Sequence, residues 1–143
     1  MLRLSVLAFL ATFLAALNAT TASAQGAKDH VIFLFGARWC APCMVEYKDL
    51  PNLVRAAAPE HITLAWVDRS IAPPADLASD VTGISVEKAR QIASEVAGVG
   101  YGLPFSAMFD ADGHACAIWR HPLAPAGIEQ LRLTCRTDMK PSR

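Results

Sequence analysis

Two cysteines separated by two residues, Cys40 and Cys43, are the first feature of the sequence that could do chemistry. They lie in the stretch RWCAPC, after an apolar run and before a segment of helical character. Unsatisfied backbone N–H groups and the helix dipole at a helix N-terminus favour a thiolate there. Two intervening residues bring the sulfurs within bonding range, so the pair can close to a disulfide and reopen by exchange. We expect Cys40 to be the exposed nucleophile and Cys43 the more buried, resolving cysteine, with Pro42 suited to the first helical turn.

The spacing alone leaves two other interpretations open. The pair could be half of a zinc site, with Cys116 and either Cys135 or His114 completing four ligands. It could also be a structural disulfide, although closing so short a loop stabilises a fold little. Zinc pairs usually occupy knuckles rather than the junction of a buried strand and a long helix. Redox exchange is therefore favoured, and no metal site is expected.

The elements around the pair begin with a strand over residues 31–35, whose continuous apolar run is typical of burial on both faces. Residues 44–60 predict a helix that Pro51 kinks or interrupts. Residues 61–69 predict a second strand. Residues 70–83, with two adjacent prolines, predict an irregular connection or a short helical piece.

The second half of the chain predicts a helix, a hairpin and a final short helix. Ser85 is the expected N-cap of the helix over residues 86–97, and Gly98 lies where that helix should end. Residues 103–119 predict two strands joined by a D-A-D-G turn, and residues 124–135 predict the last helix. The first two strands, joined by a crossover helix, should be parallel, whereas the hairpin is antiparallel. The order predicts an α/β fold with a central mixed sheet and helices on both faces.

Residues 1–24 have the features of a cleaved signal peptide: Arg3, an apolar run, and small residues at Ala22 and Ala24. The run is shorter than the roughly 20 residues that span a membrane. We therefore expect a single mature domain over residues 25–143, without stable membrane insertion, in a compartment where disulfides persist. It would carry twelve Lys and Arg against thirteen Asp and Glu, with no basic run, so no nucleic-acid partner is expected.

The stretch FLFGARWCAPC resembles the active-site strand and turn of the thioredoxin superfamily, in which W-C-x-x-C lies at a strand-to-helix junction. Leu103-Pro104, directly before a predicted strand, matches a second element of that family. There, a cis-proline faces the redox pair and the residue before it offers backbone groups to the substrate. The resemblance covers about Val31 to Cys135 and implies a thioredoxin-like fold, protein disulfide substrates and no cofactor. It also implies that Trp39 forms an aromatic wall beside the pair, with simple packing as the alternative.

Within the superfamily, the chain is similar to exported, reducing members of the cytochrome c maturation type. These carry C-x-P-C, and some have a glutamate three residues after the second cysteine, matched here by Glu46. The resemblance implies a periplasmic location, a membrane-bound electron donor as partner, and a proton relay through Glu46; a solvated carboxylate is the alternative. Leu34 stands where thioredoxin carries a buried aspartate, and Leu103 replaces the usual Thr, Val or Ile.

The resemblance also implies a structural disulfide between Cys116 and Cys135, since the final helix of the family packs near the second hairpin strand. Two free thiols or a second redox couple are the alternatives. For the whole protein, three functions stay open: a reductant, a disulfide oxidant or isomerase, and a non-catalytic module or metallochaperone that holds a soft metal on Cys40 and Cys43.

Overall fold

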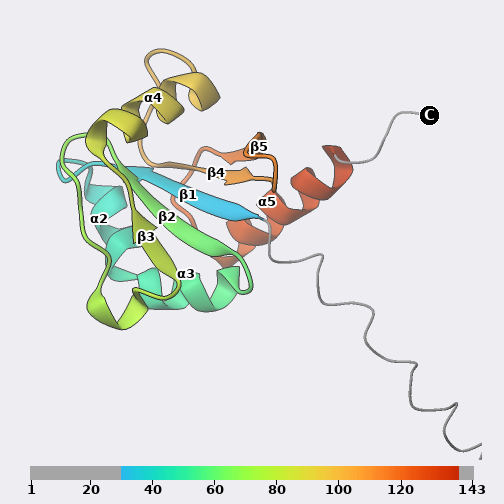
Figure 1. Ribbon diagram of the computed structural model, residues 1–143, viewed down its shortest axis with the longest axis horizontal. Coiled ribbons are helices and arrows are strands. Elements are labelled where there is room, and N and C mark those ends of the chain that lie inside the picture. The colour runs from blue at the N-terminus through green and yellow to red at the C-terminus, as the bar shows by residue number, and fades with distance from the viewer. Residues whose placement is uncertain (1–29, 139–143) are drawn as a thin grey trace, which may run out of the picture.

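The computed structural model describes residues 30–138, which form a five-stranded mixed sheet in the order β3-β2-β1-β4-β5 (Figure 1). The strands are β1 (Val31–Gly36), β2 (His61–Trp66), β3 (Val81–Gly83), β4 (Phe105–Phe109) and β5 (Ala115–Trp119). The helices are α2 (Ala41–Lys48), α3 (Leu50–Ala57), the 3-10 turn η2 (Ala75–Leu77), α4 (Val86–Ala97) and α5 (Pro125–Asp138). The predicted signal peptide, residues 1–24, lies outside the described residues. Within the described part of the chain, no helix is long and apolar enough to cross a membrane.

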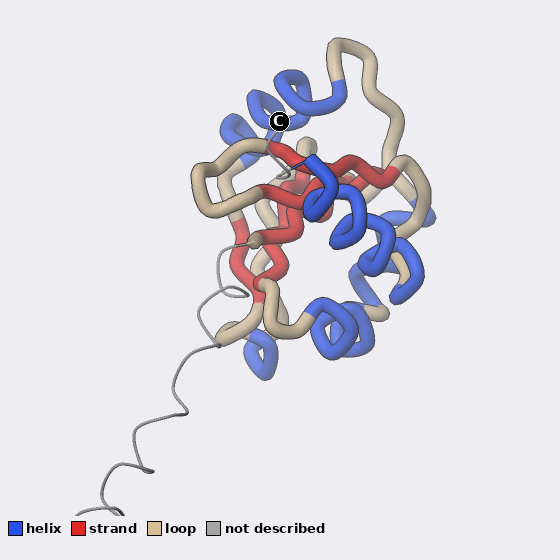
Figure 2. Tube along the Cα trace, turned by 90° about the vertical axis from the view of Figure 1, so that its right-hand side faces the viewer, coloured by secondary structure: helices blue, strands red, loops and turns tan. Residues whose placement is uncertain are grey.

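The central strand β1 separates two apolar cores, because its side chains alternate between the faces of the sheet. Ile32 and Leu34 pack in the core beneath α3 and α5. Phe35 packs in the other core, together with Ala89 and Ala93 of α4. Helices therefore cover both faces (Figure 2), as predicted. The parallel pairing of β1 with β2 and the antiparallel pairing of β4 with β1 and β5 complete the sheet.

One strand is missing from the sequence-based prediction. Residues 81–83 form β3, an edge strand that pairs in parallel with β2 through Ile62 and Val81. The sequence predicted an irregular connection here, and only its short helical piece, η2, agrees with the structure. Val81 is the only buried residue of the three, so the strand is too short to show a period-two pattern.

The predicted helix over residues 44–60 is two helices that meet at Asp49, with Pro51 in the first turn of α3. The interruption by Pro51 is confirmed, because a proline is tolerated in a first turn and not in a helix interior. Three helix ends were predicted wrongly, and one of them is the end at residue 60, since α3 stops at Ala57. The first helix starts at Ala41, since Pro42 favours helix initiation, and the last continues to Asp138, past Cys135.

Arg132 of α5 ties the last helix to the end of α3. Its guanidinium donates hydrogen bonds to the carbonyls of Ala57 at 2.8 Å and Ala58 at 3.0 Å. It also pairs with Glu60, with the Arg132 Nε to Glu60 Oε1 distance at 3.1 Å, and this bond raises the pKa of the arginine. A cation thereby satisfies the unpaired carbonyls at a helix C-terminus.

A disulfide joins Cys116 of β5 to Cys135 of α5, with 4.9 Å between the Cα atoms. Cys135 is buried in the core beneath α3 and α5, and Cys116 packs against that core. The bond closes residues 116–135 into one loop on the α5 side of the sheet.

Replacing both cysteines, Cys116→Ala with Cys135→Ala, should lower the free energy of unfolding by about 3 kcal/mol, because the unfolded chain loses a constraint over nineteen residues. Urea denaturation measures the change. Cys40→Ala with Cys43→Ala is the matched control and should cost less, since its loop is shorter. Four free thiols in the untreated, denatured protein would contradict both bonds.

Candidate active site

Cys40 and Cys43 form a disulfide at the start of α2, with 5.3 Å between their Cα atoms. Cys40 is the N-cap of the helix, and its Sγ accepts a hydrogen bond from the Cys43 N–H at 3.3 Å. The Cys40 N–H donates to the Ala37 carbonyl at 3.1 Å, which closes the turn leaving β1. The sulfur of Cys40 therefore lies against the unpaired N–H groups of the first turn, where a thiolate is stabilised.

The two cysteines differ less in exposure than the sequence predicted. Cys40 is 5% exposed and Cys43 is 2% exposed, so the expectation that Cys40 is exposed is wrong for this disulfide form. The reason is tertiary packing, because both cysteines lie in the apolar core under α4. Trp39 is 73% exposed, which also rules out the simple-packing alternative for this residue. Pro42 is exposed as well.

Gly36 lets Cys43 approach the end of β1, a role that the sequence analysis missed. A Cβ at this position would lie 3.1 Å from the Cβ of Cys43 and 3.4 Å from the Trp66 ring. Such a contact is tighter than normal packing, so a side chain here would push α2 away from the sheet. The only available signal was a glycine directly after the apolar run.

Leu103 and Pro104 lie at the same edge of the sheet as Cys40 and Cys43. Their peptide bond is cis, and Pro104 is buried. Phe105, the next residue, pairs with Phe35 in the β1–β4 ladder, and the two rings stack with centroids 4.3 Å apart. Leu103 packs against the core that contains both cysteines. Two motifs far apart in the sequence therefore lie at the same end of the sheet.

Glu46 is buried, 5% exposed, one helical turn beyond Cys43. Its carboxylate accepts a hydrogen bond from the Leu123 N–H, 77 residues away. Burial raises the pKa of Glu46 from 4.5 to about 7, and the Leu123 hydrogen bond partly opposes that rise. The alternative of a solvated helix carboxylate is therefore wrong. No sequence signal marked Leu123 as the partner of Glu46, because it binds the carboxylate through its backbone N–H.

Glu46 and Cys43 line one small cavity of about 10 Å³, room for roughly one water molecule. Leu34 and Leu64 supply apolar walls, and Tyr47 also lines the space. The Tyr47 hydroxyl donates to the Ala72 carbonyl at 3.1 Å, which ties α2 to the proline-containing connection after β2. The cavity therefore places a carboxyl group and a cysteine in shared, largely apolar surroundings.

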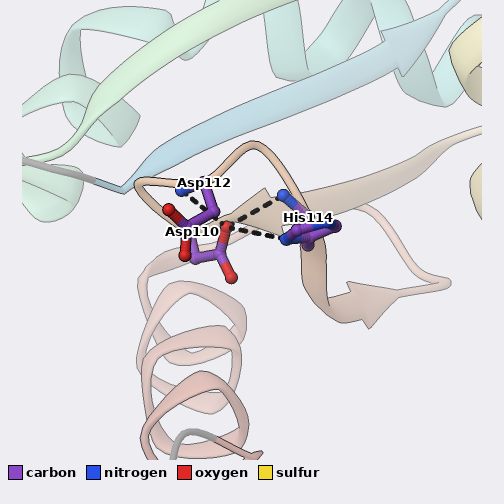
Figure 3. Close-up of side chains that lie close together, drawn as sticks. All are labelled: Asp110, Asp112 and His114. Atoms are coloured by element: carbon purple, nitrogen blue, oxygen red, sulfur yellow. Dashed lines mark hydrogen bonds and ion pairs between the residues drawn. The ribbon is translucent and has the colours of Figure 1, made fainter.

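The described residues do not bring the four-ligand zinc set together. The cysteines pair as two separate disulfides. Within residues 30–136, the only group of three or more side chains close enough to share an ion is Asp110, Asp112 and His114, in the turn between β4 and β5 (Figure 3). There, Asp110 Oδ1 accepts the N–H groups of Asp112 at 3.0 Å and His114 at 2.8 Å, so the carboxylate stabilises its own turn.

Known proteins similar to this chain are found by comparing structures and not by comparing sequences. The sequence matches no family model and no curated protein. A DsbF homologue from Corynebacterium diphtheriae is similar, with a TM-score of 0.50, 16% identity, and coverage of 74% of this chain and 71% of that one. A thioredoxin-family thiol:disulfide interchange protein from Chlorobium tepidum TLS gives a TM-score of 0.51 and 19% identity, with coverage of 75% of this chain and 80% of that one. StoA from Bacillus subtilis gives a TM-score of 0.50 and 11% identity, with coverage of 73% of this chain and 82% of that one.

The chain has a thioredoxin-like fold. The carboxyl group that lines the cavity of Cys43 comes from α2, whereas β1 contributes the apolar Leu34 to that cavity. Leu34 and Glu46 line the same cavity. In this thioredoxin-like fold, a helix residue thus reaches the space that the strand residue leaves apolar.

Glu46→Gln should change how stability depends on pH. Because the folded protein raises the pKa of Glu46 from 4.5 to about 7, it binds the proton more tightly than the unfolded chain does. The free energy of unfolding of the wild type should therefore fall as pH rises from 4.5 to 7, and glutamine removes this contribution. The stability of the variant relative to the wild type should increase by about 3 kcal/mol between pH 4 and pH 8.

Urea denaturation across this pH range measures the effect. Glu87→Gln, an exposed glutamate on α4, is the control and should follow the wild type. Parallel curves for Glu46→Gln and the wild type would contradict the raised pKa.

Proposed function

We propose that this chain is an exported thiol-disulfide oxidoreductase that reduces protein disulfides through the Cys40–Cys43 couple. The observation that carries the proposal is the disulfide at the start of α2, with the buried Glu46 carboxyl lining the cavity of Cys43. A structural staple needs no titratable group in a buried position beside it. Perturbed carboxyl groups next to a cysteine are typical of proton transfer sites.

The first step is attack by the reduced Cys40. Its thiolate, stabilised by the helix N-terminus, attacks one sulfur of a substrate disulfide. The substrate S–S bond breaks, a mixed disulfide forms between Cys40 and the substrate, and the second substrate sulfur leaves as a thiolate that takes a proton from solvent.

The second step is resolution by Cys43. Glu46 accepts the proton of the Cys43 thiol, and the resulting thiolate attacks the Cys40 sulfur. The mixed disulfide breaks, and the substrate sulfur leaves as a thiolate that takes a proton from solvent, to which Glu46 returns its own. The Cys40–Cys43 disulfide remains. Two electrons and two protons have passed to the substrate. A pKa near 7 suits Glu46 to this transfer at neutral pH.

Residues around the pair provide the substrate surface. Trp39 and Pro42 are exposed beside Cys40. Leu103 would offer backbone groups to the substrate, and the cis-proline Pro104 would face the redox pair. A shallow apolar hollow lined by Ala41, Pro42, Val45 and Pro122 continues this surface along α2. Such a surface accepts the apolar side chains of a partly unfolded substrate.

Residues 1–24 support export to the periplasm, where they would be removed as a signal peptide. A reductant there needs a continuous supply of electrons, because its surroundings are oxidising. We therefore include a membrane-bound dithiol donor as the partner that reduces the Cys40–Cys43 disulfide after each turnover.

The cysteine roles predict different outcomes for two matched variants. Cys40→Ser should abolish the protein-catalysed reduction of insulin with dithiothreitol as donor, because the thiolate that attacks the substrate is lost. Cys43→Ser should retain the attack but accumulate mixed disulfides, which mass spectrometry detects. Insulin reduction that survives Cys40→Ser would rule out the mechanism.

Glu46→Gln should slow release of the mixed disulfide by at least about tenfold at pH 8, because Cys43 loses its proton acceptor. In the wild type the release rate should rise with pH through about 7, as Glu46 ionises, and the variant should lack that rise. Single-turnover kinetics with a peptide disulfide gives the rate. An identical pH profile in both proteins would remove Glu46 from the mechanism.

A further inference from the structure

The sheet topology places several arginines at one end of the sheet and several carboxylates at the other. β1, β2 and β5 all run in the same direction, since β4 is antiparallel to both of its neighbours. Their carboxyl ends therefore meet at one edge of the sheet, where Cys40 also lies. We call this edge the redox end.

Four arginines from different segments lie at the redox end, and we call them the basic rim: Arg38, Arg69, Arg90 and Arg120. Arg38 precedes Trp39 in the turn that carries Cys40. Arg69 follows the carboxyl end of β2, and Arg120 follows that of β5. Arg90 reaches over from α4, and its Nε donates to the Val67 carbonyl at 2.6 Å.

The charge of the basic rim is mostly uncompensated. Arg38 pairs with Asp68, with 3.4 Å from Nε to Oδ2, yet its side chain stays 55% exposed. Among the described residues, no ion pair joins Arg69, Arg90 or Arg120 to a carboxylate, and all three are exposed. On the first turns of α4, the exposed Glu87 and Lys88 offset one another.

The opposite end of the sheet carries carboxylates instead. Glu60 precedes β2, Asp80 precedes β3, and Asp110 and Asp112 lie in the turn between β4 and β5. Only Glu60 of these pairs with an arginine, Arg132, within the described residues. Although the formal net charge is zero, the redox end is therefore positively charged.

We propose that the basic rim selects substrates whose reactive cysteine is flanked by acidic residues. The inference rests on the proposed function and names its substrate class. Guanidinium groups bind carboxylates with paired hydrogen bonds, and a one-signed field around a site speeds the approach of oppositely charged partners. The apolar hollow beside Pro42 lacks charge, so this discrimination falls to the arginines.

The test uses symmetric disulfides of three short peptides, each with one cysteine flanked by aspartates, glutamines or lysines. With dithiothreitol as donor and its direct reaction subtracted, the protein should reduce the acidic peptide with a kcat/KM about fivefold above that of the neutral peptide, and the basic peptide should be slowest. The acidic preference should shrink in about 0.5 M salt, because exposed charges are screened.

Charge reversal at two separate places, Arg69→Glu and Arg120→Glu, should each lower the ratio of acidic to neutral kcat/KM. Arg55→Glu on α3, an exposed arginine away from the redox end, is the matched control and should leave the ratio unchanged. The ratio itself corrects for any general loss of active protein.

A wild-type ratio of one or below, or a ratio that neither reversal changes, would overturn the inference while exchange on the neutral peptide still supports the proposed function. Failure of the wild type to reduce any of the three peptides would overturn the proposed function and this inference with it.

Discussion

The buried hydrogen bond from the Leu123 N–H to Glu46 is the contact on which the arrangement of the site depends. It joins the helix that carries Cys43 to the segment before α5, which lies inside the loop closed by Cys116 and Cys135. Segments from the two halves of the chain are thereby joined next to Cys43. A single hydrogen bond compensates only part of the cost of burying a carboxylate, which is why the pKa of Glu46 rises to about 7.

The free-energy cost of burying the Glu46 carboxylate indicates that this residue is not there for stability alone. A core formed only for stability would hold an apolar residue at this position, as it does at Leu34 on the facing strand. The protein instead keeps a group that exchanges protons near neutral pH, in the same cavity as Cys43. On the surface, Trp39 and Pro42 are exposed beside Cys40. An apolar hollow runs along α2, and the arginines of the basic rim lie around the redox end.

The sequence predicted the features that rest on local patterns. The apolar run before Cys40, the break at Pro51, the caps Ser85 and Gly98, and the D-A-D-G turn each depend on neighbouring residues alone. Features set by distant contacts were missed. The burial of Cys40 comes from packing under α4, the Glu46 partner is a backbone group without a side-chain signature, and the basic rim exists only after the strands are ordered in the sheet.

The central claim, a reducing Cys40–Cys43 couple, is tested most directly by its reduction potential, measured by equilibration with glutathione or dithiothreitol buffers. Cys116 and Cys135 should be replaced by alanine in a parallel sample, so that the second disulfide does not contribute. The account predicts a value near that of thioredoxin, about −270 mV. A value near that of a strong oxidant, about −120 mV, would contradict it.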